Sequence, residues 1–179
     1  DLLTMARSTQ LHKHCAKLAT TMLNPEQNST QGIDKLSRAL NPDSVAIVGA
    51  SADPSKRGHI TLRDLQESGY SGDIFLVNPN YENDIDGQTV YDSVSAIPSS
   101  IDLAFVATPA HTTPTILKEC GEAGVSGVVV IAAGFREVGA DELEQEIRDI
   151  ASEYDICLFG PNIQGVYNVT QGLNLLGGY

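Results

Sequence analysis

The segment between positions 49 and 58 has residue types and a spacing that could bind phosphate groups. Gly49 directly follows a short apolar run, Gly58 opens a helical pattern, and the cations Lys56 and Arg57 precede Gly58. A strand that ends in glycine and leads into a helix can present backbone N–H groups and the positive end of the helix dipole to an anion. The sequence therefore predicts a nucleotide cradle in residues 49–58, with the candidate binding residues Gly49, Ala50, Ser51, Lys56, Arg57 and Gly58.

The spacing of the cradle differs from two common nucleotide motifs. Eight residues separate Gly49 from Gly58, whereas a dinucleotide-binding loop has the closer pattern G-x-G-x-x-G. The second predicted strand ends in Asn78-Pro79, where a dinucleotide site would have Asp or Glu for the ribose 2′-hydroxyl. Lys56 is also not followed by the Ser or Thr of a P-loop. The longer loop favours a bulky, multiply phosphorylated nucleotide, and an NAD(P)-binding domain stays open as an alternative.

Alternating strand and helix patterns surround the cradle. Short runs rich in β-branched residues predict buried strands of a parallel sheet at residues 45–48, 73–78, 101–107, 128–132 and 156–159. Helical spacing of apolar residues predicts helices over residues 58–68, from Pro114 to Gly121 or Gly124, and over residues 141–154. This alternation predicts an α/β fold, a Rossmann-like, doubly wound and mostly parallel sheet of five strands or slightly more.

The loops after these strands provide further candidate binding residues. In doubly wound sheets, ligands bind beyond the carboxyl ends of the strands, near the point where the strand order reverses. Here those ends are small, proline-bearing or amide-bearing, and none carries a plausible acid–base residue, so we expect binding without a catalytic residue. The candidates outside the cradle are Asn78, Pro79, Thr108, Pro109, Gly134, Pro161 and Asn162.

Composition narrows the class of protein. The 179 residues and 41% hydrophobic content suit one domain with a sizeable core. The net charge of −12 argues against nucleic acid or an anionic membrane as partner, and no apolar run approaches the ~20 residues of a membrane span. The three widely spaced cysteines predict a reducing, cytoplasmic setting and neither a disulfide framework nor a zinc site.

The two ends of the chain differ from the middle. Leu11, Cys15, Leu18 and Met22 form one helical stripe, which Asn24-Pro25 should end. Residues 26–32 are polar and predict a turn before a second short helix that closes at Asn41-Pro42. We therefore expect a helical N-terminal extension or linker at residues 1–40, the main domain at residues 41–172, and the start of a linker to a following domain at residues 173–179.

Four segments carry a family resemblance, in order and with intact spacing. They are Ser44-Val-Ala-Ile-Val-Gly-Ala-Ser-Ala-Asp-Pro, Val77-Asn78-Pro79, Gly134-Phe135-x-Glu137-x-Gly139 and Gly160-Pro161-Asn162-x-x-Gly165. Together they resemble the CoA-binding domain of the NDP-forming acyl-CoA synthetases, a family that includes ADP-forming acetyl-CoA synthetase and, more distantly, the succinyl-CoA synthetase alpha subunit. The resemblance covers about residues 33–175. Asn80, where many relatives have a basic residue, and Ile163-Gln164 depart from the family pattern.

The resemblance implies a position for coenzyme A across the strand ends. The cradle would lie along the phosphates, Asn78 and Pro79 would flank the adenine and its ribose, and the thiol end would lie at residues 160–162. The pantetheine arm would lie near Thr108, Pro109, Ala133 and Gly134.

The resemblance also implies a reaction in which this chain takes only one part. The complete enzyme would convert acyl-CoA, ADP and phosphate into the free acid, CoA and ATP, through an acyl phosphate and a phosphohistidine. The phosphohistidine would belong to a separate flavodoxin-like domain, and an ATP-grasp module would complete the ligase. This chain would bind and orient CoA and be catalytically silent alone. A stand-alone or acetyltransferase-fused regulatory CoA-binding module is the alternative.

Overall fold

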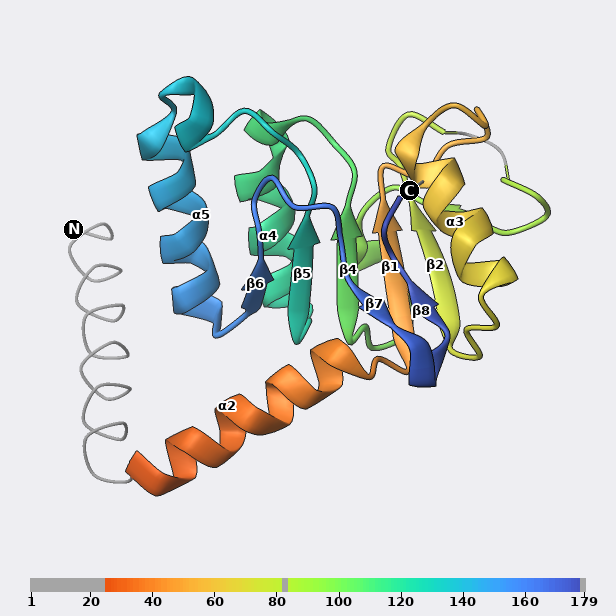
Figure 1. Cartoon of the computed structure of the whole chain (residues 1–179). Coiled ribbons are helices and arrows are strands. Elements are labelled where there is room, and N and C mark those ends of the chain that lie inside the picture. The colour runs from red at the N-terminus through yellow and green to blue at the C-terminus, as the bar shows by residue number, and fades with distance from the viewer. Residues whose placement is uncertain (1–24, 82–83, 178–179) are drawn as a thin grey trace, which may run out of the picture. The chain divides into compact units, whose positions relative to one another are not determined.

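The computed structural model describes residues 25–81 and 84–177, and residues 25–31 by their backbone alone. Six parallel strands form its main sheet in the order β3-β2-β1-β4-β5-β6 (Figure 1). They are β1 (Ser44–Val48), β2 (Asp73–Val77), β3 (Val90–Tyr91), β4 (Leu103–Val106), β5 (Gly127–Val130) and β6 (Cys157–Phe159). Because β1 pairs with β2 on one side and β4 on the other, the strand order reverses between β1 and β4. The predicted α/β, doubly wound parallel sheet is confirmed.

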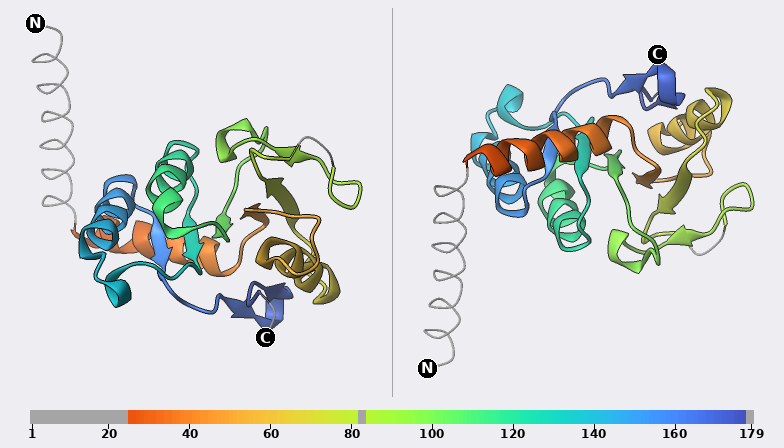
Figure 2. Two further views of the ribbon diagram at one scale, coloured as in Figure 1. Left: turned by 90° about the horizontal axis from the view of Figure 1, so that it is seen from above. Right: turned by 90° about the horizontal axis from the view of Figure 1, so that it is seen from below.

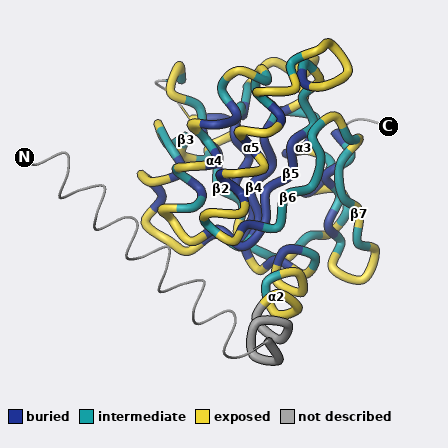
Figure 3. The backbone as a smooth tube through the Cα atoms, turned by 90° about the vertical axis from the view of Figure 1, so that its left-hand side faces the viewer, coloured by how far each residue is buried: buried dark blue, intermediate teal, exposed yellow. Residues whose placement is uncertain are grey.

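The central strands form the core of the domain. Every residue of β1, β4 and β5 is buried, as expected for parallel strands that are covered on both faces (Figure 3). The strand predictions from apolar runs are confirmed to within three residues at each end. The remaining strand, β3, lies outside the five predicted strand ranges, because two residues are too short to show a strand period.

Three helices flank the sheet at the predicted positions. They are α3 (Arg57–Glu67), α4 (Thr113–Glu122) and α5 (Asp141–Tyr154). Figure 2 shows α4 on one side of the sheet and α3 on the other. Leu117 of α4 and Ile147 of α5 belong to one buried cluster, which we call the α4/α5 face. Leu62 and Leu65 of α3 belong to a second buried cluster on the opposite side.

The end of the chain completes the second cluster. We call residues 166–177 the C-terminal strap, and it contains β7 (Tyr167–Asn168), the 3₁₀ turn η4 (Val169–Gln171) and β8 (Leu173–Asn174). β7 and β8 pair antiparallel, and Leu173 and Leu175 are fully buried among the α3 side chains. We call this second cluster the α3/strap face. The domain boundaries at residues 40 and 172 stay predictions.

The expected turn at residues 26–32 is wrong, because these residues are helical in α2 (Pro25–Leu40). Pro25 stands at the start of the helix, where its missing N–H costs no hydrogen bond. Gly32 costs only about 1 kcal/mol within a helix, which is too little to interrupt it. Residue 34 ends one unit of the chain and residue 35 begins the next, so α2 spans the boundary. The predicted stripe from Leu11 to Met22 lies outside the described residues.

Within the described ranges, no helix combines the length and the apolar character needed to cross a membrane.

Candidate functional site

The cradle depends on two glycines that meet at the junction of β1 and α3. Gly49 has φ of 94°, a conformation that favours glycine, and a Cβ there would lie 2.9 Å from the carbonyl oxygen of Ala107. A Cβ on Gly58 would overlap the carbonyl oxygen of Gly49. The N–H groups of Gly49 and Ala50 donate to the carbonyl of Val77 at 2.9 and 3.2 Å. The start of α3 therefore packs directly on the end of β1.

The loop between these glycines is ordered by its own polar groups. The Asp53 carboxylate accepts hydrogen bonds from the backbone N–H and the hydroxyl of Ser55 at 2.9 and 2.7 Å. These bonds, chiefly the one from the backbone N–H, hold the pKa of Asp53 below its usual value. Ser51 Oγ accepts from the N–H of Asp53 at 3.1 Å, and His59 Nδ1 lies 3.2 Å from the carbonyl oxygen of Ser51. The cradle is therefore a defined turn.

The N-terminus of α3 faces this turn without a capping carboxylate. Lys56 is the N-cap residue, its side chain makes no capping hydrogen bond, and the first turn of α3 contains no acidic residue. Such a helix end favours an anion through its dipole and its backbone N–H groups. Lys56 and Arg57 are both exposed. The Arg57 guanidinium donates to the carbonyl of Gly177 in the strap.

Asn78 joins the end of β2 to the cradle. Its Nδ2 donates to the carbonyl of Ala50 at 2.7 Å, and its Oδ1 accepts from the N–H of Asn80 at 3.0 Å. Tyr81, which sequence reasoning missed, accepts a hydrogen bond from the N–H of Ala52 at 2.8 Å. Pro79 is exposed beside these residues. The structure thus brings Asn78 and the cradle together, as predicted.

The remaining candidates follow along the same edge of the sheet. Thr108 adjoins the cradle, because a Cβ on Gly49 would lie 3.0 Å from Thr108 Cγ2. A Cβ on Gly134 would lie 3.1 Å from Ala110 Cβ, in the 3₁₀ turn η2 (Ala110–Thr112) that follows exposed Pro109.

The ends of β5 and β6 are joined by a backbone hydrogen bond. The N–H of Asn162 donates to the carbonyl of Ala132 at 3.0 Å, next to exposed Ala133. Asn162 has φ of 56°, and the peptide bond before Pro161 is cis. The candidates from all five strand ends therefore lie along one edge, in the order of the strands.

Glu137 is a residue whose role sequence reasoning missed, although it belongs to the motif Gly134-Phe135-x-Glu137-x-Gly139. Its carboxylate accepts from the N–H of Gly134 at 2.5 Å and from the N–H of Phe135 at 3.3 Å. The bond from Gly134 is the main cause of a lowered pKa at Glu137. The N–H of Gly134 is therefore engaged by this carboxylate, and Glu137 fixes the loop after β5. The signal in the sequence was a glutamate three residues after the glycine that ends the strand, a spacing that lets its carboxylate accept from the loop's own N–H groups.

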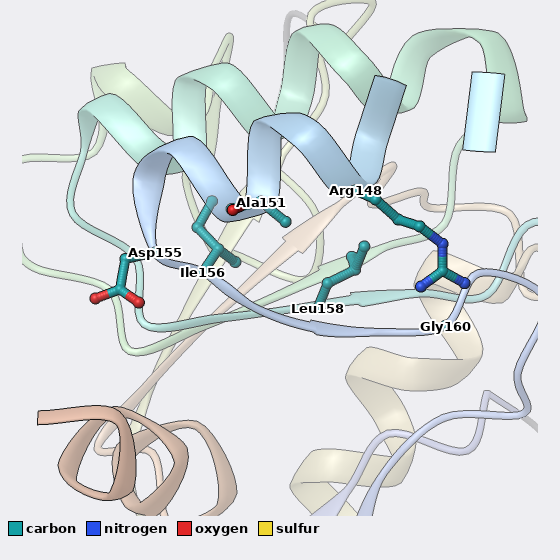
Figure 4. Close-up of a pocket in the computed structure, with 7 residues that line it drawn as sticks. Arg148, Ala151, Asp155, Ile156, Leu158 and Gly160 are labelled. Atoms are coloured by element: carbon teal, nitrogen blue, oxygen red, sulfur yellow. The ribbon is translucent and has the colours of Figure 1, made fainter. Parts of the chain in front are cut away.

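A cavity of about 330 Å³ lies at a different place, between α5 and the edge strand β6 (Figure 4). Its charged residues already have partners, since Arg148 pairs with Glu144 at 2.7 Å and Asp155 pairs with Lys35 at 2.9 Å. Gly160 is the point at which the cavity approaches the candidate site. The cavity is lined by Arg148, Ala151, Ser152, Asp155, Ile156, Leu158 and Gly160.

Comparison with known proteins gives one consistent result. Residues 43–168 match the model of a family described as CoA binding domain. The chain is 43% identical over 133 residues to an acetate–CoA ligase (ADP-forming) of Methanocaldococcus jannaschii, a match that covers 74% of this chain and 18% of that protein. It is 41% identical over 144 residues to the alpha subunit of acetate–CoA ligase (ADP-forming) I of Pyrococcus furiosus. This match covers 78% of this chain and 31% of that subunit.

Solved structures agree with the sequence matches. The dinucleotide forming acetyl-coenzyme A synthetase 1 of Ca. Korarchaeum cryptofilum, in complex with phosphate and ADP, superposes with a TM-score of 0.76 at 39% identity. That match covers 80% of this chain and 31% of the solved chain. The chain therefore spans less than a third of the length of these relatives. The family predicted from four motifs is confirmed: the chain belongs to the CoA-binding domain family, in the branch found in ADP-forming acyl-CoA synthetases.

Proposed function

We propose that this chain binds coenzyme A along the carboxyl ends of the parallel strands and presents its thiol for acyl transfer. The observation that carries the proposal is the contact between Gly49 and Gly58 at the switch point, within a chain of the CoA-binding domain family. This contact leaves the uncapped N-terminus of α3 beside a wide turn. The backbone N–H groups in the first turn of α3 suit the diphosphate of CoA.

The proposed position of CoA follows the order of the strands. The diphosphate would lie on the cradle, and the adenosine would lie against the β2 end at Asn78 and Pro79. The pantetheine arm would pass Thr108, Pro109, Ala133 and Gly134, and the thiol would reach Pro161 and Asn162. These small or amide-bearing residues support the proposal, because a thin, flexible arm can lie close to the backbone where side chains are small.

The proposed contribution to chemistry is positional. A thiol that is held next to an acyl phosphate attacks it in an effectively unimolecular step, which removes much of the entropic cost of the encounter. The thiol sulfur forms the thioester bond, phosphate leaves, and the thiol proton is lost. We propose that the acyl phosphate, the phosphohistidine and the ADP site belong to flavodoxin-like and ATP-grasp modules that act with this chain, in cis or as another subunit.

Calorimetric titration tests the proposal against the nearest alternative. The 179-residue chain is titrated in parallel with CoA, acetyl-CoA, NAD⁺ and ATP. We expect saturable binding of CoA and acetyl-CoA and weaker binding of NAD⁺, because the β2 end offers the Asn78 amide where a dinucleotide site has a carboxylate. Tighter binding of NAD⁺ than of CoA would overturn the proposal and favour an NAD(P)-binding domain.

A further inference from the structure

The strap follows α3 from one end of the helix to the other. At the C-terminal end of α3, Ser68 Oγ donates to the carbonyl of Gly172 at 2.5 Å, and a Cβ on Gly172 would lie 2.8 Å from the backbone of Tyr70. At the N-terminal end, the Arg57 guanidinium donates to the carbonyl of Gly177. The strap is thus fastened to both ends of the helix that begins at the cradle.

The middle of the strap is anchored by burial. Leu173 and Leu175 are fully buried on the α3/strap face, and the N–H of Leu175 donates to the carbonyl of Val166 at 3.0 Å. A Cβ on Gly177 would lie 3.5 Å from Thr61 Oγ1, and this hydroxyl is buried without a hydrogen-bond partner among the described residues. The last residues of the strap therefore lie against the first two turns of α3.

Arg57 needs this partner for an electrostatic reason. A cation in the first turn of a helix is disfavoured by the positive end of the helix dipole. The carbonyl of Gly177 accepts from the guanidinium and so compensates that charge. The same contact connects two parts of the chain that are 120 residues apart in sequence.

We propose that Arg57 is a positioning residue, which fastens the strap to the first turn of α3 and makes the affinity of the cradle for its nucleotide depend on the docked strap. The proposal rests on the proposed function and deepens it. Lys56 and Arg57 then have different roles: Lys56 faces the ligand and Arg57 acts through Gly177. Because α3 begins against the Gly49 carbonyl, a strap that holds this turn also holds the N–H groups that would meet the diphosphate.

A double-mutant cycle tests this role. Four chains are compared: the full chain, Arg57→Ala, a chain that ends at Leu175, and the truncated chain with Arg57→Ala. Each single change should weaken CoA binding about five-fold, and the combination should also weaken it about five-fold, because both changes break one contact. Dissociation constants are measured by calorimetry well below the thermal midpoint of every variant. At such temperatures every chain is folded, so a loss of global stability alone would leave the dissociation constant unaltered. Arg57→Lys should restore part of the affinity.

Arg63→Ala is the matched control. Arg63 also lies on α3, but its guanidinium pairs with Asp64 of the same helix at 3.0 Å, so its removal should leave CoA affinity unchanged. The proposal would be overturned if Arg57→Ala lowered CoA affinity by the same factor in the truncated chain and in the full chain, because Arg57 would then contact the ligand directly. It would also be overturned if Arg57→Ala left CoA affinity unchanged in the full chain.

Amide hydrogen exchange separates this proposal from the proposed function. Without any ligand, Arg57→Ala should speed exchange at His59 and Ile60 of α3 and at Leu175, and Arg63→Ala should not. A chain that fails to bind CoA but shows this pattern would overturn the proposed function and retain the coupling between Arg57 and the strap. Unchanged exchange in Arg57→Ala would overturn the coupling whatever the ligand.

Discussion

The two faces of the sheet are closed in different ways. On the α4/α5 face, two helices that each follow a neighbouring strand in sequence supply the buried residues, such as Leu117 and Ile147. On the α3/strap face, α3 is joined by residues 166–177, and Leu175 and Leu62 belong to the same buried cluster. The first face is therefore built from local strand–helix units, whereas the second needs a contact between distant parts of the chain.

This difference bears on function, because the proposed nucleotide cradle belongs to only one of the faces. Helix α3 begins at the cradle, and its other surfaces contact β1 and the strap. A weakened α4/α5 face should reduce the stability of the fold. A weakened α3/strap face should reduce stability and also CoA affinity.

Gly58→Val should have the largest effect. The added Cβ would overlap the carbonyl oxygen of Gly49, and this backbone cannot move without displacing β1. We expect a loss of about 5 kcal/mol in the free energy of unfolding, at the upper end for a single substitution, and no measurable CoA binding. Urea unfolding and calorimetric titration measure the two effects.

Gly121→Ala on α4 is the comparison for the other face. Its added Cβ would overlap Tyr154 Cγ and lie 2.6 Å from Tyr154 Cβ, so rotation of the ring cannot relieve the clash and α5 must shift; stability should fall, while CoA affinity should stay unchanged. Because Gly58→Val can prevent folding altogether, Gly58→Ala provides the affinity measurement. Normal CoA affinity in a folded Gly58→Ala chain would contradict the proposed cradle.

A pair of leucine truncations compares the faces directly. Leu117 and Leu175 are both fully buried, one on each face. Leu117→Ala should cost about 3 kcal/mol of stability and leave CoA affinity unaltered at temperatures where the protein is folded. Leu175→Ala should cost a similar amount of stability, and it should also weaken CoA binding because Leu175 anchors the strap on the α3/strap face. Equal CoA affinities in the two variants would show that the strap does not influence the site.

The sequence predicts the parts of the fold that repeat a local pattern. The apolar run of β1 and the helical spacing of α5 each predict their own element, because burial on two faces or on one stripe leaves a regular period. The two-residue strands β3, β7 and β8 have no such period. They form because neighbouring segments supply hydrogen-bond partners, and tertiary partners are not visible in a short window.

The candidate site also has features that the sequence predicts and features that only the folded chain shows. The rule that ligands bind at the carboxyl ends of parallel strands led from the strand predictions to the loops at Gly49, Asn78 and Thr108, and the structure brings these loops together. The direction of the Arg57 guanidinium was not predictable, because its acceptor is 120 residues away. The role of Glu137 depends on two backbone N–H groups that converge only in the folded loop.

Lys56→Ala should separate the two cations of the cradle. CoA carries a 3′-phosphate that dephospho-CoA lacks, and an exposed ammonium that meets this group would contribute about five-fold to affinity. We therefore expect Lys56→Ala to weaken CoA binding more than dephospho-CoA binding. Arg57→Ala should weaken both equally, because it acts through the strap. Equal losses for both ligands in Lys56→Ala would show that Lys56 does not contact the 3′-phosphate.

Acid should act on the α4/α5 face through Glu144, and this is the smallest effect that we predict. Hydrogen bonds from Arg148, at 2.7 and 3.2 Å, are the main cause that lowers the pKa of Glu144 from 4.5 in the folded state. A lowered folded pKa means that the carboxylate stabilises the fold above its unfolded pKa and that this contribution is lost as pH falls through the folded pKa. Glu144→Gln should therefore be less stable than the wild type near pH 7, and the difference should shrink below about pH 4.

Glu146→Gln is the control for this prediction. Glu146 is at an exposed position of α5, with a looser ion pair of 3.8 Å to Lys118, so this variant should differ little from the wild type at either pH. Chemical unfolding at a series of pH values measures the difference, and a Glu144→Gln deficit that stays constant into acid would show that packing, and not the charge of Glu144, supports this face.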